Sequence, residues 1–470
     1  MVQLNNVFSA PDRFLNAGKT LAQTSKRQMH IGFDDTDSTR QGCTTHVAAL
    51  LVEKLEKMGA TFVDYPSLIR LNPNVPWKTR GNGALCLRIE CDEALEPEIK
   101  EKTVSLIETH SDLNWKGTDP GIVFLSDQQV PVELTAFAKA AETGIVTLKH
   151  ALQLIRKFQA EALGYNTRRG IIGALAAIGE TLNEDYTFEL ISYRKPENFG
   201  TKRRVDTASI FEMDQKLQAF TFNNVDTEKR RVIITPRGPD PVLFGIRGET
   251  PQAVKQAFGM VKPLEPVDRW VIFRSNQGTD AHLKRISALS EAKPYSSVIA
   301  KGTVSRNPQL IPVRHIVFAI KDATAEVDCA AYEPTGVLRK IAHKLAVGDE
   351  IEVYGAVRKP AHGKPLTVNL EKINVLHLAL KMKAQNPRCP NCGKRLKSMG
   401  KNQGLRCENC KTKFPSAQKN EILQERALQV GLYVTSTRSQ RHLTKPLRRY
   451  GLEKHGEATP ELNMEWHSKS

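Results

Sequence analysis

The chain has 470 residues, of which 40% are hydrophobic and 25% charged, a composition that supports roughly three or four packed domains and excludes a disordered polymer. Lys and Arg number 68 against 51 Asp and Glu, a net charge of +17. Because such an excess attracts polyanions, we expect nucleic acid to be the first partner. An acidic membrane surface, or charge that serves solubility alone, is the alternative.

Membrane and disulfide classes are disfavoured by the sequence. No stretch approaches the roughly 20 apolar residues that a membrane span needs, and residues 1–27 lack the apolar centre of a signal peptide. We therefore expect a cytoplasmic protein without a membrane partner. Eight cysteines are too few for a disulfide scaffold, and close cysteine pairs in a reducing compartment indicate metal.

The first part of the chain predicts a layered catalytic region over residues 28–265, preceded by a flexible extension at 1–27. Strands are expected at 29–33, 62–71, 84–90, 122–125 and 188–193, and helices at 44–58, 95–108 and 148–163, with a small apolar segment at 171–178. The helices follow from apolar residues at a period near 3.6. Strands and helices in alternation favour an α/β or ferredoxin-like arrangement.

A different pattern follows a predicted linker at 266–294. Strands are expected at 298–303, 311–320, 326–331, 350–357 and 366–375, with a short helix at 335–344 between the third and fourth. Five strands with a helix at that point predict an OB-fold over residues 295–378; a generic small β-barrel is the alternative. Residues 416–470 predict a basic C-terminal tail with one helical run at 419–430.

Four cysteines predict a metal site within residues 385–415. Cys389 and Cys392 form one C-x2-C pair and Cys407 and Cys410 a second, with 14 residues between the pairs. Zinc prefers four tetrahedral ligands, and thiolates are among its best. Because protein fills all four positions, we predict a structural zinc ribbon; a redox C-x-x-C is the alternative, although neither pair opens a helix in a thioredoxin-like unit. The many cations around the pairs favour binding to nucleic acid over docking to another protein.

An acidic loop follows the first predicted strand. Asp34, Asp35 and Asp37 lie within four residues, and such carboxylates repel one another unless a cation lies among them. Magnesium takes one or two carboxylates and fills its other positions with phosphates or water. An exposed acidic turn is the alternative. Thr44 and Thr45 begin the next helix, where backbone N–H groups and the helix dipole attract phosphate, although both are also ordinary N-cap residues.

Two glycine-containing loops agree with a phosphate site. Residues 78–83 combine two cations with two glycines that allow close backbone approach. Residues 168–174 open a small-residue helix, although close helix packing explains these glycines equally well. Neither loop matches a Walker P-loop or a dinucleotide fingerprint. Together with the acidic loop, they predict a site for a metal-bound triphosphate.

Several segments, taken in order, resemble a single family. They are residues 32–38, 43–45, 69–73, 78–83, 169–177, 222–226, 241–249 and 265–269. In these segments the chain resembles the archaeal agmatidine synthetases of the minor isoleucine tRNA, the TiaS family, over about residues 29–450. The number of motifs and their order make the resemblance specific.

The resemblance implies a fold and a reaction. The fold is multidomain α+β: a kinase-like catalytic domain with a ferredoxin-like domain, then an OB-fold and a C-terminal zinc ribbon. The reaction is ATP-dependent conjugation of agmatine to C2 of the wobble cytidine in the isoleucine tRNA with anticodon CAU, so that AUA is decoded as isoleucine. ATP becomes AMP, its γ-phosphoryl group activates the C2 oxygen, and agmatine displaces the phosphorylated oxygen.

The resemblance also implies site residues. Asp34, Asp35 and Asp37 are expected to bind Mg²⁺ and ATP, and Thr44 to be phosphorylated by the enzyme itself. The nucleotide site is expected to include Arg80, Gly81, Asn82, Gly83 and Gly170.

Agmatine carries a guanidinium head and requires an acidic or aromatic pocket. The candidates for that pocket are Asp226, Glu249 and Phe244. The two carboxylates are equally consistent with surface residues or ion-pair partners.

Two other functions stay open on the sequence alone. A tRNA-binding protein without catalysis needs no triple aspartate beside a helix start. An RNA kinase or nucleotidyltransferase acting on another position uses the same phosphate chemistry but needs no agmatine. Residues 1–27 precede the region of resemblance, and the basic tail is either a tRNA contact or a solvated charge run.

Overall fold

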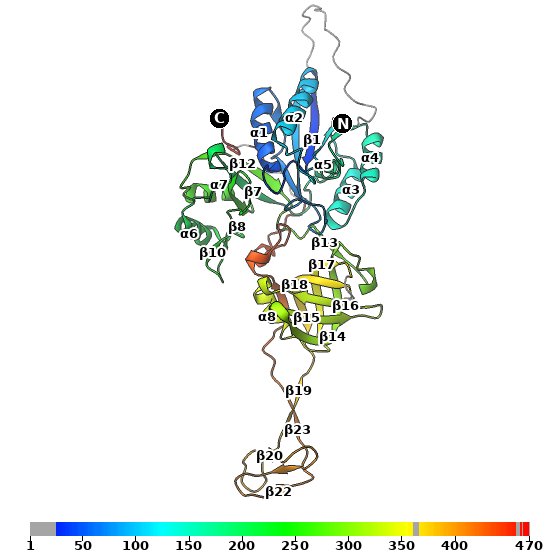
Figure 1. Ribbon diagram of the computed structural model, residues 1–470, viewed down its shortest axis with the longest axis vertical. Coiled ribbons are helices and arrows are strands. Elements are labelled where there is room, and N and C mark those ends of the chain that lie inside the picture. Colours follow the sequence, from blue (N-terminus) through cyan, green and yellow to red (C-terminus); the bar gives the residue numbers. More distant parts are fainter. Residues whose placement is uncertain (1–24, 361–365, 457–460, 463, 470) are drawn as a thin grey trace, which may run out of the picture.

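The computed structural model describes residues 25–360, 366–456, 461–462 and 464–469. Three bodies follow one another along its long axis: a large sheet covered by helices, a β-barrel, and a small ribbon at the end of a narrow stalk (Figure 1). The predicted extension at 1–27 falls almost wholly outside the described residues. Its last two residues already belong to strand β1 (Lys26–Asp34).

One mixed sheet of ten strands spans the whole catalytic region. Its order is β6-β5-β1-β4-β3-β12-β7-β11-β8, with β2 paired to β4. The other strands are β2 (Thr61–Phe62), β3 (Ser67–Arg70), β4 (Gly83–Asp92), β5 (Gly121–Leu125), β6 (Glu161–Gly164), β7 (Thr187–Arg194), β8 (Thr221–Phe222), β11 (Val242–Gly248) and β12 (Val267–Ser275). The short strands β9 (Val225–Asp226) and β10 (Arg231–Val232) form a separate pair.

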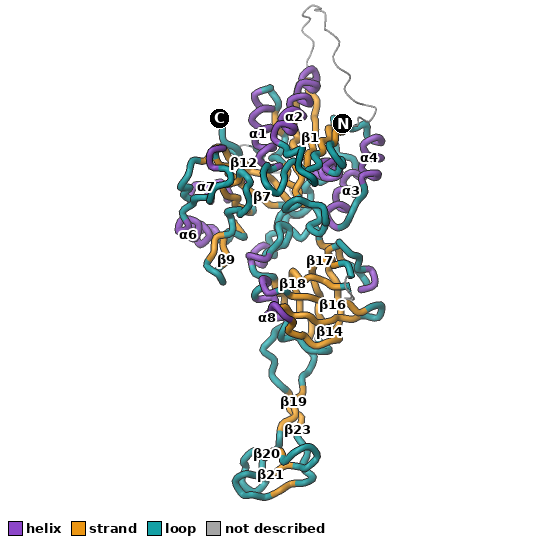
Figure 2. The backbone as a smooth tube through the Cα atoms, in the orientation of Figure 1, coloured by secondary structure: helices purple, strands orange, loops and turns teal. Residues whose placement is uncertain are grey.

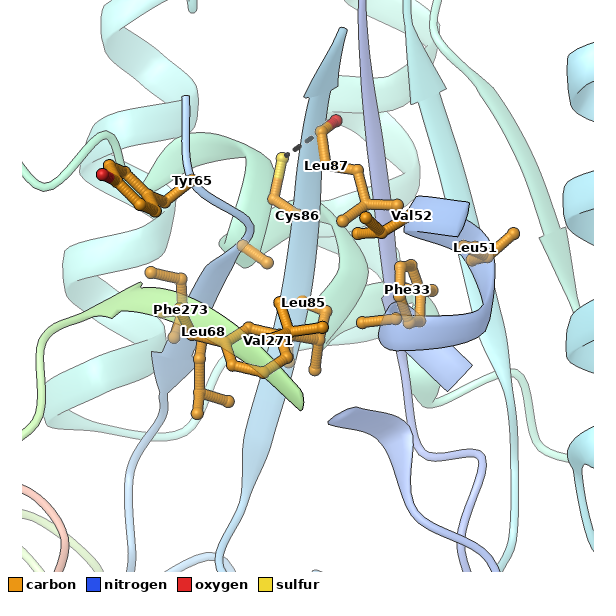
Figure 3. Close-up of a cluster of buried hydrophobic side chains, with 14 of the residues drawn as sticks. Phe33, Leu51, Val52, Tyr65, Leu68, Leu85, Cys86, Leu87, Val271 and Phe273 are labelled. Carbon is orange, nitrogen blue, oxygen red and sulfur yellow. Dashed lines mark hydrogen bonds between the residues drawn. The ribbon is translucent and has the colours of Figure 1, made fainter. Parts of the chain in front are cut away.

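Helices cover both faces of this sheet. They are α1 (Thr44–Lys57), α2 (Glu96–His110), α3 (Val132–Thr143), α4 (Leu148–Lys157), α5 (Gly170–Gly179), α6 (Thr207–Leu217) and α7 (Pro251–Met260). Successive residues of a strand point to opposite faces. Gly32 accordingly lies against the backbone of α5, while Phe33 points toward Leu51 and Val52 of α1 (Figure 3). Strand β1 is therefore held from both sides just before the acidic loop.

The hydrophobic core is continuous across the junction between the two halves of the sheet. Leu68 of β3 and Leu85 of β4 lie beside Val271 and Phe273 of β12 (Figure 3), and all four are buried. Strand β12 runs parallel to β3 and antiparallel to β7. The two predicted units thus share one sheet, and their relative position is fixed by backbone hydrogen bonds as well as by apolar packing.

Several predicted elements need correction. The helix expected at 148–163 ends at Lys157, because Gln159 takes a φ of 53° that no helix continues through, and the remainder becomes the edge strand β6. The strand expected at 62–71 is two strands, β2 and β3. Helix α3 was not predicted, and the small apolar segment at 171–178 is the buried helix α5.

The predicted linker at 266–294 is wrong in its first part. Residues Val267–Ser275 form β12, which lies inside the sheet and pairs on both edges. Its residues from Trp270 onward are buried, and a backbone bridge joins Val271 to His467 of the C-terminal segment. The apolar run at 270–273 is only four residues long and has an arginine on each side, so the local pattern does not distinguish this strand from a connection between domains.

The second body is a closed five-stranded barrel, as the strand pattern predicts. Its strands are β14 (Ser297–Ile311), β15 (His315–Lys321), β16 (Glu326–Ala331), β17 (Glu350–Arg358) and β18 (Thr367–His377). Their order is β14-β15-β16-β18-β17, and a β14–β17 pairing closes the ring. Helix α8 (Val337–Ala342) lies between the third and fourth strands, and strand β13 (Leu283–Arg285) adds to β14.

The third body is connected to the barrel through a two-stranded stalk (Figure 2). The stalk pairs β19 (Met382–Gln385) with β23 (Asn420–Leu423). The predicted helix at 419–430 is therefore wrong, because backbone pairing across the stalk overrides local propensity. Beyond the stalk, β20 (Lys397–Ser398), β21 (Leu405–Arg406) and β22 (Lys413–Phe414) form a small sheet around the cysteines.

The C-terminal segment returns from the ribbon to the other two bodies. Strand β24 (Gly431–Val434) pairs with β18 of the barrel, and the chain then crosses to the catalytic sheet. Arg449 is fully buried there between Asp185 and Glu249, and Trp466 packs on Phe62. The described part of this segment is thus folded structure rather than a solvated tail.

In the described ranges, every helix is too short or too polar to cross a lipid bilayer.

Candidate active site between two halves of one sheet

The acidic loop is held by hydrogen bonds from three directions. The Asp35 backbone N–H donates to Asp34 Oδ1 over 2.7 Å. The Asp119 N–H and the Thr79 hydroxyl donate to the two carboxylate oxygens of Asp35 over 3.1 and 3.4 Å. Asp35 has a φ of 60°, a conformation that Asp tolerates better than most residues. The chain therefore turns sharply as it leaves β1 and presents its carboxylates in a fixed arrangement.

Burial disfavours the ionised form of the three carboxyl groups in this loop. It raises the pKa of Asp34 well above its ordinary value, and the neighbouring Asp35 carboxylate raises it further. Burial also raises the pKa of Asp35 to about 7, and it raises the pKa of Asp37 despite the nearby Arg80 guanidinium. A bound cation would remove this penalty. The donor set therefore suits a hard divalent ion such as magnesium.

The three carboxylates do not converge on one point. Asp34 lies against α5, Asp35 faces Asp119 and Thr79, and the Asp37 carboxylate pairs with Arg80 Nε over 3.3 Å. In the described ranges, the cysteine quartet alone brings three or more potential metal ligands together. A site in which one ion contacts all three aspartates is thus not preformed. This is consistent with a metal that takes most of its ligands from phosphate and water.

Helix α1 begins beside this loop. Its N-cap, Cys43, makes no side-chain capping hydrogen bond, so the first N–H groups of the helix keep their capacity to bind an anion. The Thr36 hydroxyl donates to Thr44 Oγ1 over 3.1 Å, which fixes Thr44 at the wall of the cavity. The predicted proximity of the aspartates and the helix start is confirmed.

The loop at 78–83 is joined to the acidic loop chiefly through Arg80. Its guanidinium donates to the carbonyl oxygens of Ser38 and Gly42 over 2.7 and 3.2 Å, besides its pair with Asp37. Arg80 is therefore largely engaged within the protein. Gly81 and Gly83 lie against Arg70: a methyl group added to either would come within 2.9 Å of Arg70 Nη1.

The glycines of α5 allow the helix to approach the sheet closely. A methyl group on Gly170 would come 2.3 Å from the Gly121 backbone nitrogen, and one on Gly173 would come 1.9 Å from Asp34 Oδ2. Close packing, the alternative interpretation of this motif, is therefore correct for both. Both glycines also line the cavity, so the same closeness brings the start of α5 to the acidic loop.

A cavity of about 500 Å³ joins these parts. All nine predicted catalytic and nucleotide-binding residues line it: Asp34, Asp35, Asp37, Thr44, Arg80, Gly81, Asn82, Gly83 and Gly170. At its wall the exposed Trp77 stacks on the Arg169 guanidinium at 3.9 Å, an aromatic face of the kind that a nucleobase stacks on.

Further lining residues were not predicted as site residues, among them Glu189, Asp240, Arg247 and His442. They come from β7, the loop before β11, β11 itself, and the C-terminal segment. Arg247 lies within a segment that carried the family resemblance, which was the available signal for it. His442 is separated from Arg247 by 195 positions, and no local pattern connects them.

The predicted agmatine candidates lie elsewhere. Glu249 pairs with Arg449, Asp226 pairs with Arg438 over 3.0 Å, and Phe244 is buried in the core. The ion-pair alternative is therefore correct for both carboxylates, and none of the three lines the cavity. The additional acids that do line it are Glu189 and Asp240.

The four cysteines assemble as predicted. Cys389 and Cys410 Sγ lie 3.4 Å apart, as do Cys392 and Cys407 Sγ. All four sulfur atoms lie within 4.8 Å of one another, an arrangement that fits tetrahedral thiolate coordination of zinc. The first pair lies in the turn before β20, and the second pair lies in the turn that connects β21 and β22.

Family models match most of the chain. The TiaS TCKD domain matches residues 30–167, the TiaS FLD domain residues 168–282 and the TiaS C-terminal zinc ribbon domain residues 386–428. A curated protein of Methanocaldococcus jannaschii, named as the 2-agmatinylcytidine synthetase TiaS of an isoleucine tRNA, is 42% identical over 425 residues, which cover 89% of this chain and 98% of that protein.

Solved structures give the same result. The crystal structure of TiaS in complex with its isoleucine tRNA and ATP is similar with a TM-score of 0.81 and 41% identity, covering 90% of this chain and 97% of that one. The crystal structure of TiaS in complex with the same tRNA, AMPCPP and agmatine is similar with a TM-score of 0.78 and 38% identity, again covering 90% and 97%.

Proposed function

Because this chain belongs to the TiaS family, we propose that it is an ATP-using ligase that joins agmatine to C2 of the wobble cytidine of the isoleucine tRNA with anticodon CAU. The observation that carries the proposal is the cavity itself. It combines half-buried carboxylates, two helix starts and a stack of aromatic and guanidinium groups at the junction of two half-sheets. The modified tRNA would then read AUA as isoleucine.

ATP and Mg²⁺ are assigned to the end of the cavity that contains the acidic loop. Of the three carboxylates in the acidic loop, Asp37 is paired with Arg80. In the described residues, Asp34 and Asp35 have no ion pair with a cationic side chain. Magnesium would supply neutralisation of phosphate charge. Asp34 and Asp35 would hold it, and the N–H groups at the start of α1 would bind phosphate oxygens.

Phosphoryl transfer to the cytidine would proceed by positioning and electrostatics, since a phosphoryl transition state needs little else from a protein. The C2 oxygen attacks the γ-phosphorus, and the amine of agmatine then displaces the phosphorylated oxygen from C2. Thr44 is the proposed site of self-phosphorylation. Its hydroxyl lines the same cavity and is fixed by Thr36.

The cationic ends of agmatine are assigned to Glu189 and Asp240 in place of the candidates predicted from the sequence. Each already faces a guanidinium: Glu189 lies 3.1 Å from Arg247 Nε, and Asp240 lies 3.0 Å from Arg203 Nη2 and 3.8 Å from Arg80 Nη1. A carboxylate has two oxygens and about four acceptor positions, so either can accept a further donor from the substrate.

The other bodies are assigned to tRNA binding in the cytoplasm. We classify the barrel as an OB-fold from its strand order and the position of α8, and the two halves of the large sheet as kinase-like and ferredoxin-like domains. Structural Zn²⁺ is assigned to the cysteine quartet. Cations dominate the ribbon, whose Lys and Arg residues outnumber its acids, as expected for a module that contacts the RNA backbone.

The test uses ATP, Mg²⁺, labelled agmatine and a set of tRNA transcripts. Label is expected to enter only the isoleucine transcript with anticodon CAU, and AMP to form in step with it. RNA phosphorylation without incorporation of agmatine would favour an RNA kinase instead. Tight tRNA binding without ATP turnover would favour a binding protein.

A further inference from the structure

His442 stands at the junction of two cavities. A second cavity of about 730 Å³ adjoins the first, and both are lined by His442 and Gly81. The charged residues of the second are all cations: Arg70, Lys78, Arg80, Arg358, Lys359 and Arg441. The acidic loop lines only the first. A basic cavity suits the phosphates of an RNA strand, so His442 lies between the path of an RNA strand and the proposed phosphate-transfer site.

Two groups lie against the imidazole Nδ1, and only one of them can hydrogen-bond to it in a given tautomer. Arg247 Nη2 and Gln277 Oε1 both lie 3.0 Å from this atom. Gln277 Nε2 donates to the buried Glu189 carboxylate, so its oxygen has to face His442. A guanidinium only donates, and a charge-assisted hydrogen bond is roughly twice as strong as a neutral one. Arg247 therefore decides the tautomer, and Nδ1 carries the lone pair.

The ring is neutral and its single proton is on Nε2. Burial, together with the charges of Arg70, Arg247 and Lys78, lowers the pKa of His442 well below its ordinary value. Within the described residues Nε2 has no hydrogen-bond partner. A methyl group on Gly81 would come 3.1 Å from Nε2, so the glycine leaves space in front of this donor.

We propose that His442 donates a hydrogen bond from Nε2 to N3 of the target cytosine. This inference rests on the proposed function. Cytosine N3 is an acceptor, whereas N3 of uracil carries a hydrogen and would meet the fixed donor unfavourably. His442 is therefore a residue that selects cytidine over uridine at the wobble position.

The same hydrogen bond assists the displacement step. The amine nitrogen forms a bond to C2, and charge develops on N3 as the C2–N3 double bond opens. A donor fixed in advance at that position stabilises the charge. The electrons return as the C2–O bond breaks and phosphate leaves with the bonding pair, while the proton of the amine passes to water. His442 keeps its own proton throughout.

The test compares three tRNAs that differ at one base. The wobble position carries cytidine, uridine or 3-deazacytidine, in which C–H replaces N3, and dissociation constants are measured with a non-hydrolysable ATP analogue present. The full-length protein is expected to bind the cytidine tRNA roughly tenfold more tightly than the other two. His442→Ala is expected to bind all three within about twofold and to incorporate agmatine roughly 10- to 100-fold more slowly.

Two further variants control the experiment. His442→Gln keeps an N–H donor and is expected to recover part of the discrimination. His150→Ala removes an exposed histidine of α4 that lines neither cavity, and is expected to behave as the unmodified protein. Zinc content and melting temperature report whether each variant is folded.

The inference is overturned if the unmodified protein does not distinguish cytidine from 3-deazacytidine, or if His442→Ala distinguishes them equally well. A variant whose only defect is a raised KM for ATP would place His442 on the triphosphate and also overturn it. These outcomes differ from failure of the proposed function, in which the unmodified protein incorporates no agmatine into the CAU tRNA.

Discussion

Gly173 and Asp34 are in direct contact: a methyl group on the Gly173 Cα would come 1.9 Å from Asp34 Oδ2. Helix α5 and the end of β1 are pressed together here, since a methyl group on Gly32 would likewise come 2.2 Å from the Ala174 carbonyl oxygen. Helix α5 therefore leaves no space for the Asp34 carboxylate to move toward it. The position of the Asp34 carboxylate thus depends on the absence of a side chain at Gly173 in α5.

Gly173→Ala is expected to slow ATP turnover strongly while tRNA affinity changes little. The added methyl group displaces Asp34 from the acidic loop, and a misplacement of about 1 Å in an active site costs roughly 100-fold in rate. Rates of AMP formation, measured beside a tRNA binding titration, check this. Gly259→Ala, at a helical glycine with open space around it, is the matched control. Full activity in Gly173→Ala would contradict the proposed role of Asp34.

Asp35→Asn is expected to remove Mg²⁺-dependent ATP turnover and to leave tRNA binding intact. The amide keeps the shape of the side chain but loses the charge that would hold a divalent ion. Because Asp35 is costly to charge in the folded protein, the variant is also expected to be at least as stable as the parent. Asp127→Asn, at an exposed acid outside the cavity, controls for loss of charge. A large loss of tRNA affinity would count against the metal role.

Local spacing allowed much of the site to be predicted. Asp34, Asp35 and Asp37 are neighbours in the chain, and each cysteine pair spans four residues, so short spacing places each group in a single loop or turn. Barrel strands were predictable because their alternation is regular. The part of the site formed by Glu189, Arg247 and His442 was not predictable. Contacts between distant strands and the C-terminal segment produce no periodic pattern in the sequence.

The errors in the predicted elements have a similar cause. A helical period runs on through residues 158–163, yet the backbone reverses at Gln159 and the residues after it join the edge of the sheet. Strand β12 is hard to tell from a linker in the sequence, because its role is set by partners more than 70 residues away, at Arg194 and Thr187. In both places tertiary pairing overrides the local pattern.

Cys407→Ser is expected to release zinc and to weaken tRNA binding without abolishing ATP binding. The cysteine quartet holds together a ribbon whose own core is only a few residues, and such modules unfold without their metal. Metal analysis and a binding titration at two salt concentrations check this, because loss of phosphate contacts also lowers the salt dependence. Cys329→Ser, at a thiol buried in the barrel outside the quartet, controls for loss of a thiol. Retention of one equivalent of zinc by Cys407→Ser would contradict the site.

Arg449→Met is expected to destabilise the protein through the C-terminal segment. The Arg449 side chain is fully buried and makes ion pairs with Asp185 and Glu249, and removing one partner of a buried pair typically costs about 3–5 kcal/mol. Lys445 and Lys454 also approach these carboxylates, so we expect the lower end, about 3 kcal/mol. Arg448→Met, next in sequence and 38% exposed in its side chain, is the matched control and is expected to cost at most about 1 kcal/mol.

Denaturant unfolding of both variants measures this difference. If the C-terminal segment were a solvated tail, the two substitutions would have equal and small effects. Agmatine incorporation adds a second readout, because the segment that Arg449 anchors also carries His442 into the cavity. Arg449→Met is therefore expected to lower the rate at temperatures well below its unfolding transition, whereas Arg448→Met is not. Equal rates for both variants would mean that the contact with Arg247 holds His442 in place without the Arg449 ion pairs.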